Sequence, residues 1–520
     1  MWSNGVYMNR KIATAFLLAA TAVGQVTKYG LSTPANFTPT LTSRGQIPFA
    51  GNSSFQIGLR YTPNIFGSIL AVSANSTNIS LQFTTLYVDP TGILLFDLPS
   101  LVDTFPVAIP AVPGIAGLTA YAQAVVVDPI IPWGYGFTNG LSVTVLPDVT
   151  PRRAWIPGED VSVAGTTVSA LASLDLTTWP PSFRACGTLG SASTPFAPKI
   201  AVASLSGRAF AHGNGANSSI RIYDIAGDPV GISPWVMVDS IPLTLPVDPT
   251  PGKRDLAVNN AGSRLFATSG AGTAAATSQL DVFDVSQSPP VAMQSMSFPG
   301  TGGGCLALDL ACTETRMALL IGSDLFPTLS LYSVSMTGSV PLTSIGAVPL
   351  PGFSGDPYPN DVQFSQDGST VFVTGSNGGF AVVSVDTMTV VAAGTFALGP
   401  NGSGCAVAEA QGTAIGVLAD VTSPGKFHIF DINPESNTFG SSLGTVTFPS
   451  TSLGCARLSG RQDMVVGVDT SAGFPACQFV EVVSFSSGLL TPNYARIQMP
   501  SVSSLSPTGN SARAHAFDLR

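Results

Sequence analysis

The feature that most constrains this chain is a phrase of short strands and glycine turns that recurs along it. The phrase is clearest at Asn360–Val391, where a strand, a glycine turn, a second strand, a glycine loop and a third strand follow one another. One such unit leaves both faces of its small sheet uncovered, whereas units repeated around an axis cover each other. The repeat therefore predicts a closed β-propeller.

The turn after the first strand aligns the copies of this phrase. It falls at Gly207, Gly262, Gly368, Gly412, Gly460 and Gly509, and one further copy has Glu314 or its neighbour instead. The copies are 44 to 55 residues apart, close to the roughly 40–50 residues of a four-stranded blade. Glycine is expected here because a tight hairpin needs a residue that tolerates positive φ.

A third strand rich in β-branched and aromatic residues follows in each copy, as expected for a strand packed on both faces. The predicted third strands are Ser219–Ile225, Gln279–Val285, Thr328–Val334, Phe380–Asp386, Lys426–Ile432 and Phe479–Phe485. Four of them end in an aspartate, namely Asp224, Asp284, Asp386 and Asp431. An aspartate repeated at this point indicates turn formation rather than catalysis.

One copy is split between the two ends of the chain. Val502–Phe517 matches the first two strands of a unit, and the chain stops at Arg520. The missing third strand matches Val168–Thr178, far upstream. A blade built from both ends closes the ring and removes exposed sheet edges. Six whole copies and one shared copy predict a seven-bladed propeller closed by both chain ends.

The segment QDGSTVFVTGSNGGFAVVSVDTMTVV, residues 366–391, resembles the repeat of the YVTN family of bacterial seven-bladed propellers. The same pattern is similar to the lactonase-like seven-bladed propellers, which include sugar lactonases and proteins with no known activity. The resemblance covers about residues 151–520 and implies a fold rather than a reaction, because one fold carries many functions.

The N-terminal residues 8–25 have the layout of a secretory signal peptide. Arg10 and Lys11 precede an apolar run, and Ala20-Thr21-Ala22 provides a small-residue cleavage site. The run is shorter than the roughly 20 residues needed to span a bilayer. Residues 1–7 lack this layout, which leaves Met1 and Met8 as alternative starts. We expect a chain that is secreted, or held at the cell surface or in the periplasm, with no transmembrane segment.

Residues 26–147 differ in texture from the repeats. Short alternating strands between Pro and Gly turns predict a small β-sandwich. The segment PAVPGIAGLTAYAQAVVVDP, residues 110–129, followed by TNGLSVTV, residues 138–145, resembles a domain of secreted proteins of planctomycetes and some other environmental bacteria, with no assigned function. Residues 147–157 are predicted to be a linker, with the propeller at 158–520. The whole chain is therefore expected to be all-β.

Charge excludes one class of partner. Only 10% of the residues are charged, the net charge is −9 and the pI is about 4.7. A nucleic-acid footprint needs clustered Lys and Arg, so no nucleic-acid partner is expected. Gly and Pro are abundant, but the mean hydropathy of +0.36 favours many short apolar strands over disorder.

Two carboxylates are the candidate site residues. Asp255 and Asp361 open first strands, where they could face the mouth of a propeller channel and, as the lactonase-like resemblance implies, hold a divalent cation. The alternative is that they bind loop backbone. The histidines His212, His428 and His515 fall in different copies, and no G-x-S-x-G motif marks a nucleophile.

Cysteines open three first strands, at Cys305, Cys405 and Cys455. Cys405 and Cys455 belong to adjacent copies, so a disulfide between them is conceivable in an exported chain. Spacing alone does not establish pairing, and a small buried apolar role is the other interpretation. A metal site is not predicted, because zinc sites usually have pairs of ligands close together in the sequence, such as C-x-x-C, and these cysteines form no such pair.

These patterns favour an exported, non-enzymatic propeller that binds a protein or an envelope glycan, with no cofactor expected. The alternative is a lactonase-like hydrolase with a polar or metal site at the channel mouth. The two differ in whether polar groups from several blades converge on one pocket.

Overall fold

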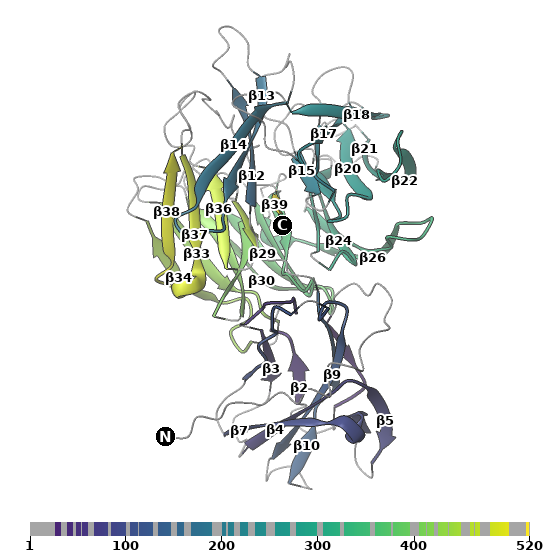
Figure 1. Ribbon diagram of the computed structural model, residues 1–520, viewed down its shortest axis with the longest axis vertical. Helices are drawn as coiled ribbons and strands as arrows, with labels where there is room; N and C mark the ends of the chain where they lie inside the picture. The colour runs from purple at the N-terminus through teal and green to yellow at the C-terminus, as the bar shows by residue number, and fades with distance from the viewer. Residues whose placement is uncertain are drawn as a thin grey trace. The chain divides into compact units, whose positions relative to one another are not determined.

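The computed structural model forms two compact units (Figure 1). One comprises Met1–Ser43 and Ile47–Val149, and the other comprises Arg44–Gln46 and Thr150–Arg520. The regular structure of the described residues is β-strand with three short 3-10 turns, η2 (Pro90–Gly92), η3 (Pro351–Phe353) and η4 (Phe485–Ser487), and without an α-helix. The described residues are 26–32, 39–44, 48–53, 55–60, 67–81, 85–99, 104–112, 114–127, 134–146, 153–160, 168–189, 200–203, 206–212, 219–226, 235–245, 255–270, 277–298, 305–311, 313–322, 327–353, 359–375, 378–395, 405–411, 413–420, 425–434, 436–448, 458–461, 463–468, 479–498 and 516–518.

The first unit contains a six-stranded sheet of order β1-β11-β9-β4-β7, with β10 paired to β9. Its strands are β1 (Val26–Tyr29), β4 (Gly67–Ser73), β7 (Leu94–Pro99), β9 (Thr119–Val127), β10 (Tyr135–Phe137) and β11 (Gly140–Thr144). The smaller sheets are β2 (Thr40–Thr42), β3 (Gln56–Arg60) and β8 (Thr104–Pro106), and β5 (Ser76–Ser80) with β6 (Thr85–Val88). One core cluster takes Leu41 and Ile57 from the three-stranded sheet and Leu70 and Ala124 from the larger one.

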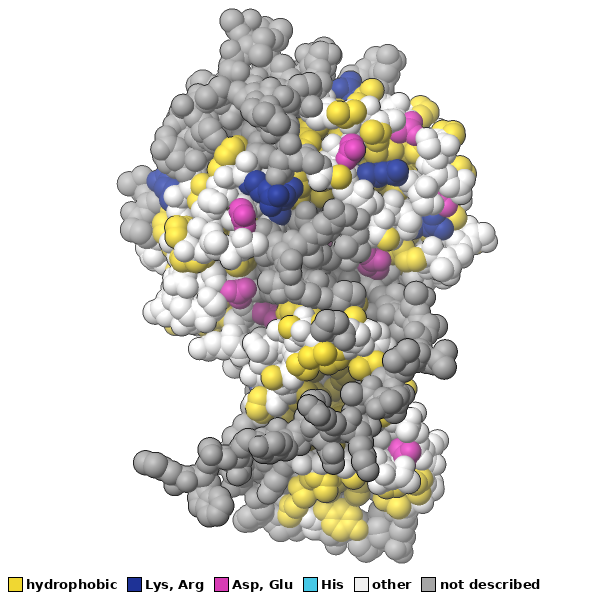
Figure 2. All heavy atoms as spheres, in the orientation of Figure 1, with side chains coloured by type: hydrophobic (Ala, Val, Ile, Leu, Met, Phe, Trp, Pro, Cys, Tyr) yellow, Lys and Arg dark blue, Asp and Glu magenta, His cyan; other side chains and the backbone are white. Residues whose placement is uncertain are grey.

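The outer surface of this first unit carries exposed apolar side chains (Figure 2). On the edge strand β7, Leu94, Leu95 and Phe96 are exposed. The view of the second unit in Figure 2 shows basic and acidic side chains scattered rather than gathered into a patch.

The second unit contains seven four-stranded antiparallel sheets among the described residues. Six follow chain order: β15 to β18, β19 to β22, β23 to β26, β27 to β30, β31 to β34 and β35 to β38. The strands of the first three are β15 (Ile200–Ala203), β16 (Arg208–His212), β17 (Ser219–Asp224), β18 (Val236–Pro242), β19 (Leu256–Val258), β20 (Arg264–Gly270), β21 (Ser278–Asp284), β22 (Val291–Phe298), β23 (Cys305–Leu310), β24 (Arg316–Ile321), β25 (Thr328–Val334) and β26 (Leu342–Pro349). Those of the next three are β27 (Pro359–Phe364), β28 (Thr370–Gly375), β29 (Gly379–Ser384), β30 (Thr389–Thr395), β31 (Cys405–Ala410), β32 (Thr413–Asp420), β33 (Lys426–Asp431), β34 (Ser442–Thr447), β35 (Leu458–Arg461), β36 (Met464–Val468), β37 (Phe479–Ser484) and β38 (Asn493–Gln498).

The predicted third strands are confirmed. Each of the six segments is the third strand of its sheet, as β17, β21, β25, β29, β33 and β37, with ends that differ by two residues at most. The turn role of the aspartates is also confirmed at three positions, because Asp224, Asp284 and Asp431 each accept a hydrogen bond from the backbone two residues on.

The predicted turn residues are confirmed in part. Gly207, Gly262 and Gly368 have φ of +64°, +66° and +73°, and Glu314 takes the same region with φ of +55°. The prediction for Gly460 is wrong, because Gly460 lies in β35 paired with Val465. That hairpin turns after Arg461, which pairs with Met464. Gly412 and Gly509 lie outside the described residues.

The seventh sheet combines both ends of the second unit, but not in the predicted way. Its order is β14-β13-β12-β39, with β12 at Arg153–Asp160, β13 at Val168–Asp175, β14 at Ser182–Thr188 and β39 at Ala516–Asp518. The expected third strand is confirmed as β13. The prediction that Val502–Phe517 supplies the first two strands is wrong for the second strand: Ala516 and Phe517 lie in the edge strand β39, and the place between β39 and β13 belongs to β12, which begins inside the predicted linker. The rest of that predicted segment, residues 502–515, lies outside the described residues.

The physical reason for this difference is visible in β12. Ala154 and Ile156 pack into one core cluster and Trp155 into another, so the strand is buried on both faces. Pro151, before β12, and Pro157, inside it, are turn signals in the sequence, although Pro157 pairs with Leu171 within the sheet.

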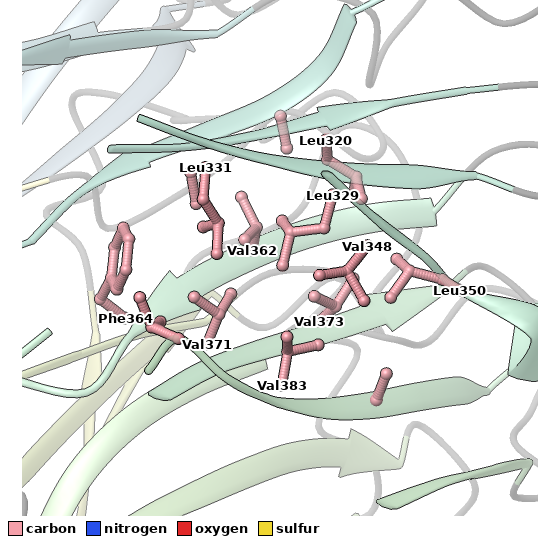
Figure 3. Close-up of a cluster of buried hydrophobic side chains, with 14 of the residues drawn as sticks. Leu320, Leu329, Leu331, Val348, Leu350, Val362, Phe364, Val371, Val373 and Val383 are labelled. Carbon is pink, nitrogen blue, oxygen red and sulfur yellow. The ribbon is translucent and has the colours of Figure 1, made fainter. Parts of the chain in front are cut away.

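Apolar clusters join the faces of consecutive sheets in the second unit. Figure 3 shows one, in which Leu329 and Leu331 of β25 meet Val362 of β27 and Val371 and Val373 of β28. Similar clusters join each of the remaining pairs of consecutive sheets. A further cluster joins Ile156 and Leu174 of the β12–β14 and β39 sheet to Val466 and Val482 of the β35–β38 sheet. Each buried Val or Leu contributes about 1.5–3 kcal/mol, so these contacts between sheets stabilise the second unit.

Candidate functional site

Asp255 lies just before β19 and is fully buried. Its Oδ1 accepts a hydrogen bond from the backbone of Leu256 at 3.0 Å, and its Oδ2 accepts one from the backbone of Leu308, in the next sheet, at 3.1 Å. The backbone oxygen of Asp255 is 3.4 Å from His212 Nε2. Both carboxylate oxygens therefore bind backbone, and one of them links two sheets.

The same link between first strands recurs in the following sheets. Asp309 Oδ2 accepts from the backbone of Phe364 at 2.8 Å, joining β23 to β27. Gln363 joins β27 to β31 twice, because its Oε1 accepts from Val407 N and its Nε2 donates to Cys405 O, each at 3.0 Å. These polar side chains of the first strands hold neighbouring sheets in register.

Asp361 lies in β27 and is also fully buried. Its Oδ1 accepts from the backbone of Val362 at 2.9 Å. Asp361 lies in the β27–β30 sheet, which is separated in chain order from β19, the strand after Asp255, by the β23–β26 sheet. The burial of both side chains fits a role in strand packing better than a role in an open site.

Cys405 opens β31, where its side chain is fully buried and its Sγ is 3.9 Å from Phe372 O. Cys455 lies outside the described residues. The Cys405–Cys455 disulfide therefore stays a prediction.

A polar cluster that the sequence did not predict lies on the face of the β19–β22 sheet toward β15–β18. We call Thr244, Ser269, Gln279, Asp281 and Ser295 the Asp281 cluster. Gln279 Nε2 lies 2.6 Å from Asp281 Oδ1, 2.6 Å from Ser295 Oγ and 3.0 Å from Thr244 Oγ1. Ser269 is opposite Gln279 in the strand pairing, so it shares this face.

A second cluster crosses three strands of the β31–β34 sheet. His428 Nδ1 is 3.1 Å from Thr445 Oγ1, and His428 Nε2 is 3.5 Å from Asp420 Oδ2. Asp420 is buried, His428 is partly buried and Thr445 is exposed. The order of groups, a carboxylate, an imidazole and a hydroxyl, is the order that activates a hydroxyl nucleophile. The sequence showed His428 as an isolated histidine, because its neighbours come from separate strands.

Both clusters occupy a corresponding place in their sheets. Asp281 pairs with Ala267 and His428 pairs with Leu418. In each sheet the residue that follows the third strand donates a backbone hydrogen bond to the second-strand side of the hairpin, from Val285 to Ser263 O and from Ile432 to Ala414 O. Ala267 and Leu418 each lie four residues after that acceptor. The two clusters therefore lie at the same position of the repeat, which carries different side chains in the two sheets.

Titration is perturbed at the ends of third strands. The hydrogen bond from Ser286 Oγ lowers the pKa of Asp284, and Arg264, 2.8 Å away, lowers it further. The hydrogen bonds from Thr177 lower the pKa of Asp175 in the same way. These shifts belong to turns rather than to a reactive centre.

No group of three or more His, Cys, Asp or Glu side chains is placed to hold a metal ion in the part of the chain that the structure describes. Within that part, no helix is long and apolar enough to cross a membrane.

The sheets of the second unit define a β-propeller-like, all-β fold. No family model matches this chain, and no relative is found among curated proteins. Solved structures are similar to it in part. Two carry the description "putative 6-phosphogluconolactonase". The one from Bacteroides fragilis has 11% identity and a TM-score of 0.45 over 68% of this chain and 97% of its own. The one from Bacteroides uniformis has 13% identity and a TM-score of 0.47 over 67% and 98%.

A third similar structure is the dihydro-heme d1 dehydrogenase NirN in complex with DHE, with 14% identity and a TM-score of 0.41 over 68% of this chain and 65% of its own. Because all three TM-scores are below 0.5, the description of the fold rests on the sheets themselves.

Proposed function

We propose that this chain is an exported protein of the YVTN or lactonase-like type, in which the seven sheets are blades of one closed propeller behind a small β-sandwich. The pairing of β39 with β12 supports closure, as does the apolar cluster between the β12–β14 and β39 sheet and the β35–β38 sheet. The core shared by the two larger sheets of the first unit supports the sandwich. Export is proposed from residues 8–25, which lie outside the described residues.

The proposed function is binding of a protein or an envelope glycan without catalysis. The observation that carries it is the edge strand β18, where Val236, Met237 and Val238 are 66%, 55% and 51% exposed. An edge strand offers unpaired backbone groups to another chain, and adjacent exposed apolar side chains mark an interaction surface. This combination favours a protein partner over a glycan.

The second candidate is a lactonase-like hydrolase. The names of two similar structures fit this alternative more closely than binding. The observation in this chain that favours it is the series Asp420, His428 and Thr445, in which the exposed hydroxyl would be the nucleophile and the imidazole its base. The buried carboxylates Asp255 and Asp361 do not supply such a site.

One comparison of variants separates the two functions. The full chain would be incubated with an envelope fraction and cross-linked, and assayed in parallel against a panel of sugar lactones. Binding predicts saturable cross-linking that Val238→Lys abolishes and Val391→Lys, an exposed residue on the outer strand β30, leaves intact. The hydrolase is favoured instead if the chain hydrolyses a lactone, His428→Gln abolishes this activity, and Val238→Lys leaves cross-linking unchanged. This result would overturn binding as the proposed function.

A further inference from the structure

The carboxylate of Asp281 has an uncompensated charge. The side chain is 6% exposed, its Oδ1 accepts from Gln279, and its Oδ2 is buried with no hydrogen-bond partner. No ion pair reaches Asp281 from the described residues. The paired Ala267 places this face against Phe210, Ile220 and Ile222 of the neighbouring sheet, which are apolar. A buried, unpaired carboxylate is costly, so a positive charge at this place would stabilise the fold.

Oxygen atoms converge beside this carboxylate. Asp281 Oδ1, Ser295 Oγ and Thr244 Oγ1 all lie within 3.0 Å of one atom, Gln279 Nε2. An amide nitrogen carries two hydrogens, so it cannot donate to all three. Ser269 Oγ, on the same face, is buried and has no hydrogen-bond partner either. The cluster therefore contains two buried oxygens without a hydrogen-bond partner, Asp281 Oδ2 and Ser269 Oγ, beside two hydroxyls that can also turn a lone pair toward a ligand.

We propose that the Asp281 cluster binds a hard, oxygen-preferring cation of the Ca²⁺ type. The carboxylate of Asp281 and the hydroxyls of Ser269, Ser295 and Thr244 supply oxygens, and Gln279 supplies its amide oxygen when the amide turns over. Ca²⁺ accepts six to eight oxygens in irregular geometry, whereas Zn²⁺ prefers nitrogen and sulfur. Ser295 and Thr244 are exposed and give the ion a route from solvent.

The site differs from the carboxylate-rich kind, because only one of its ligands is charged. Affinity is therefore expected at the weak end for Ca²⁺, with a Kd on the order of 10⁻⁴–10⁻³ M. The inference does not depend on the proposed function, since the ion would hold two neighbouring sheets together whether the chain binds a partner or hydrolyses a substrate.

The test uses the full chain, freed of metal by chelator and dialysis. Equilibrium dialysis with radioactive calcium should show one ion per chain. Thermal unfolding in about 10 mM CaCl₂, roughly tenfold or more above the expected Kd, should raise Tm on the order of 2–5 °C. Asp281→Asn should lose both effects. Asp420→Asn, which removes a buried carboxylate from another sheet, should keep both.

A gain of affinity guards against a variant that simply fails to fold. Gln279→Glu adds a second carboxylate to the same cluster and should tighten calcium binding about tenfold or more, because affinity rises with ligand charge. Absence of bound calcium together with an unchanged Tm in the wild-type chain would overturn the proposal. An undiminished response in Asp281→Asn, or no gain in Gln279→Glu, would overturn it as well.

Discussion

At the scale of single residues, the ends of third strands combine a turn with a charge. Asp284 ends β21, accepts hydrogen bonds from Ser286 and lies 2.8 Å from Arg264 Nη1. These contacts favour the charged form, which is why the pKa of Asp284 is lowered in the folded chain. The same contacts cannot persist in the unfolded chain, so the aspartate couples folding to pH.

Asp284→Asn tests this coupling. Because the folded pKa lies below the unfolded value of about 3.9, the aspartate stabilises the fold above that pH and ceases to do so as pH falls through the folded value. We expect the variant to lose about 1–2 kcal/mol at pH 7. Urea unfolding at pH 7 and near pH 3 should show the difference between variant and wild type shrinking in acid. A difference that stays constant or widens would contradict the assignment.

At the scale of elements, polar side chains of first strands hold consecutive sheets in register. Asp309 is the clearest case, since its Oδ2 accepts the backbone N–H of Phe364 at 2.8 Å from the next sheet. We expect Asp309→Ala to destabilise the fold by about 1–3 kcal/mol, because the N–H loses its acceptor. Asp309→Asn keeps an acceptor oxygen and should recover most of this loss in a urea titration. Equal losses in both variants would show that charge, rather than the bond, matters.

The third strands could be predicted because each is a local pattern repeated with a recognisable end. The turn at Glu314 could be predicted for the same reason, since its position in the repeat was clear although its residue type was not. The turn near Gly460 could not be predicted in this way. Gly460 has the sequence signal of a turn residue but lies inside β35, and the hairpin turns only after Arg461.

The clusters around Asp281 and His428 lie beyond such patterns. Each depends on the register of three strands, and the nearest signal in the sequence is polar residues alternating within an expected two-sided strand, as at Gln279 and Asp281. The opposite holds for Asp255, whose polar character suggested a ligand site. The structure shows instead that the carboxylate accepts backbone hydrogen bonds from the adjacent Leu256 and from Leu308, 53 residues away, and the second of these could not be foreseen from the local sequence.

At the scale of the whole molecule, the proposed ring depends on a short strand at the end of the chain. β39 supplies the first strand of the seventh sheet through three pairs, Arg153 with Asp518, Ala154 with Phe517 and Trp155 with Ala516. Through β12 it supports the apolar cluster that joins the seventh sheet to the β35–β38 sheet. Removal of this strand should therefore destabilise the whole second unit rather than only the part near the end of the chain.

Deleting residues 516–520 tests whether the ring is closed in this way. The deletion exposes one edge of β12 and unsettles apolar side chains such as Ala154 and Ile156, which are buried in the cluster with the last sheet. Each strongly affected side chain adds about 1.5–3 kcal/mol, so Tm should fall by several degrees in calorimetry, with the second unit unfolding earlier as a whole. Replacing residues 519–520 alone, which leaves β39 intact, is the matched control and should leave Tm unchanged. A deletion variant that keeps the wild-type Tm would mean that the seven sheets stand without the terminal strand, and closure by both chain ends would have to be abandoned.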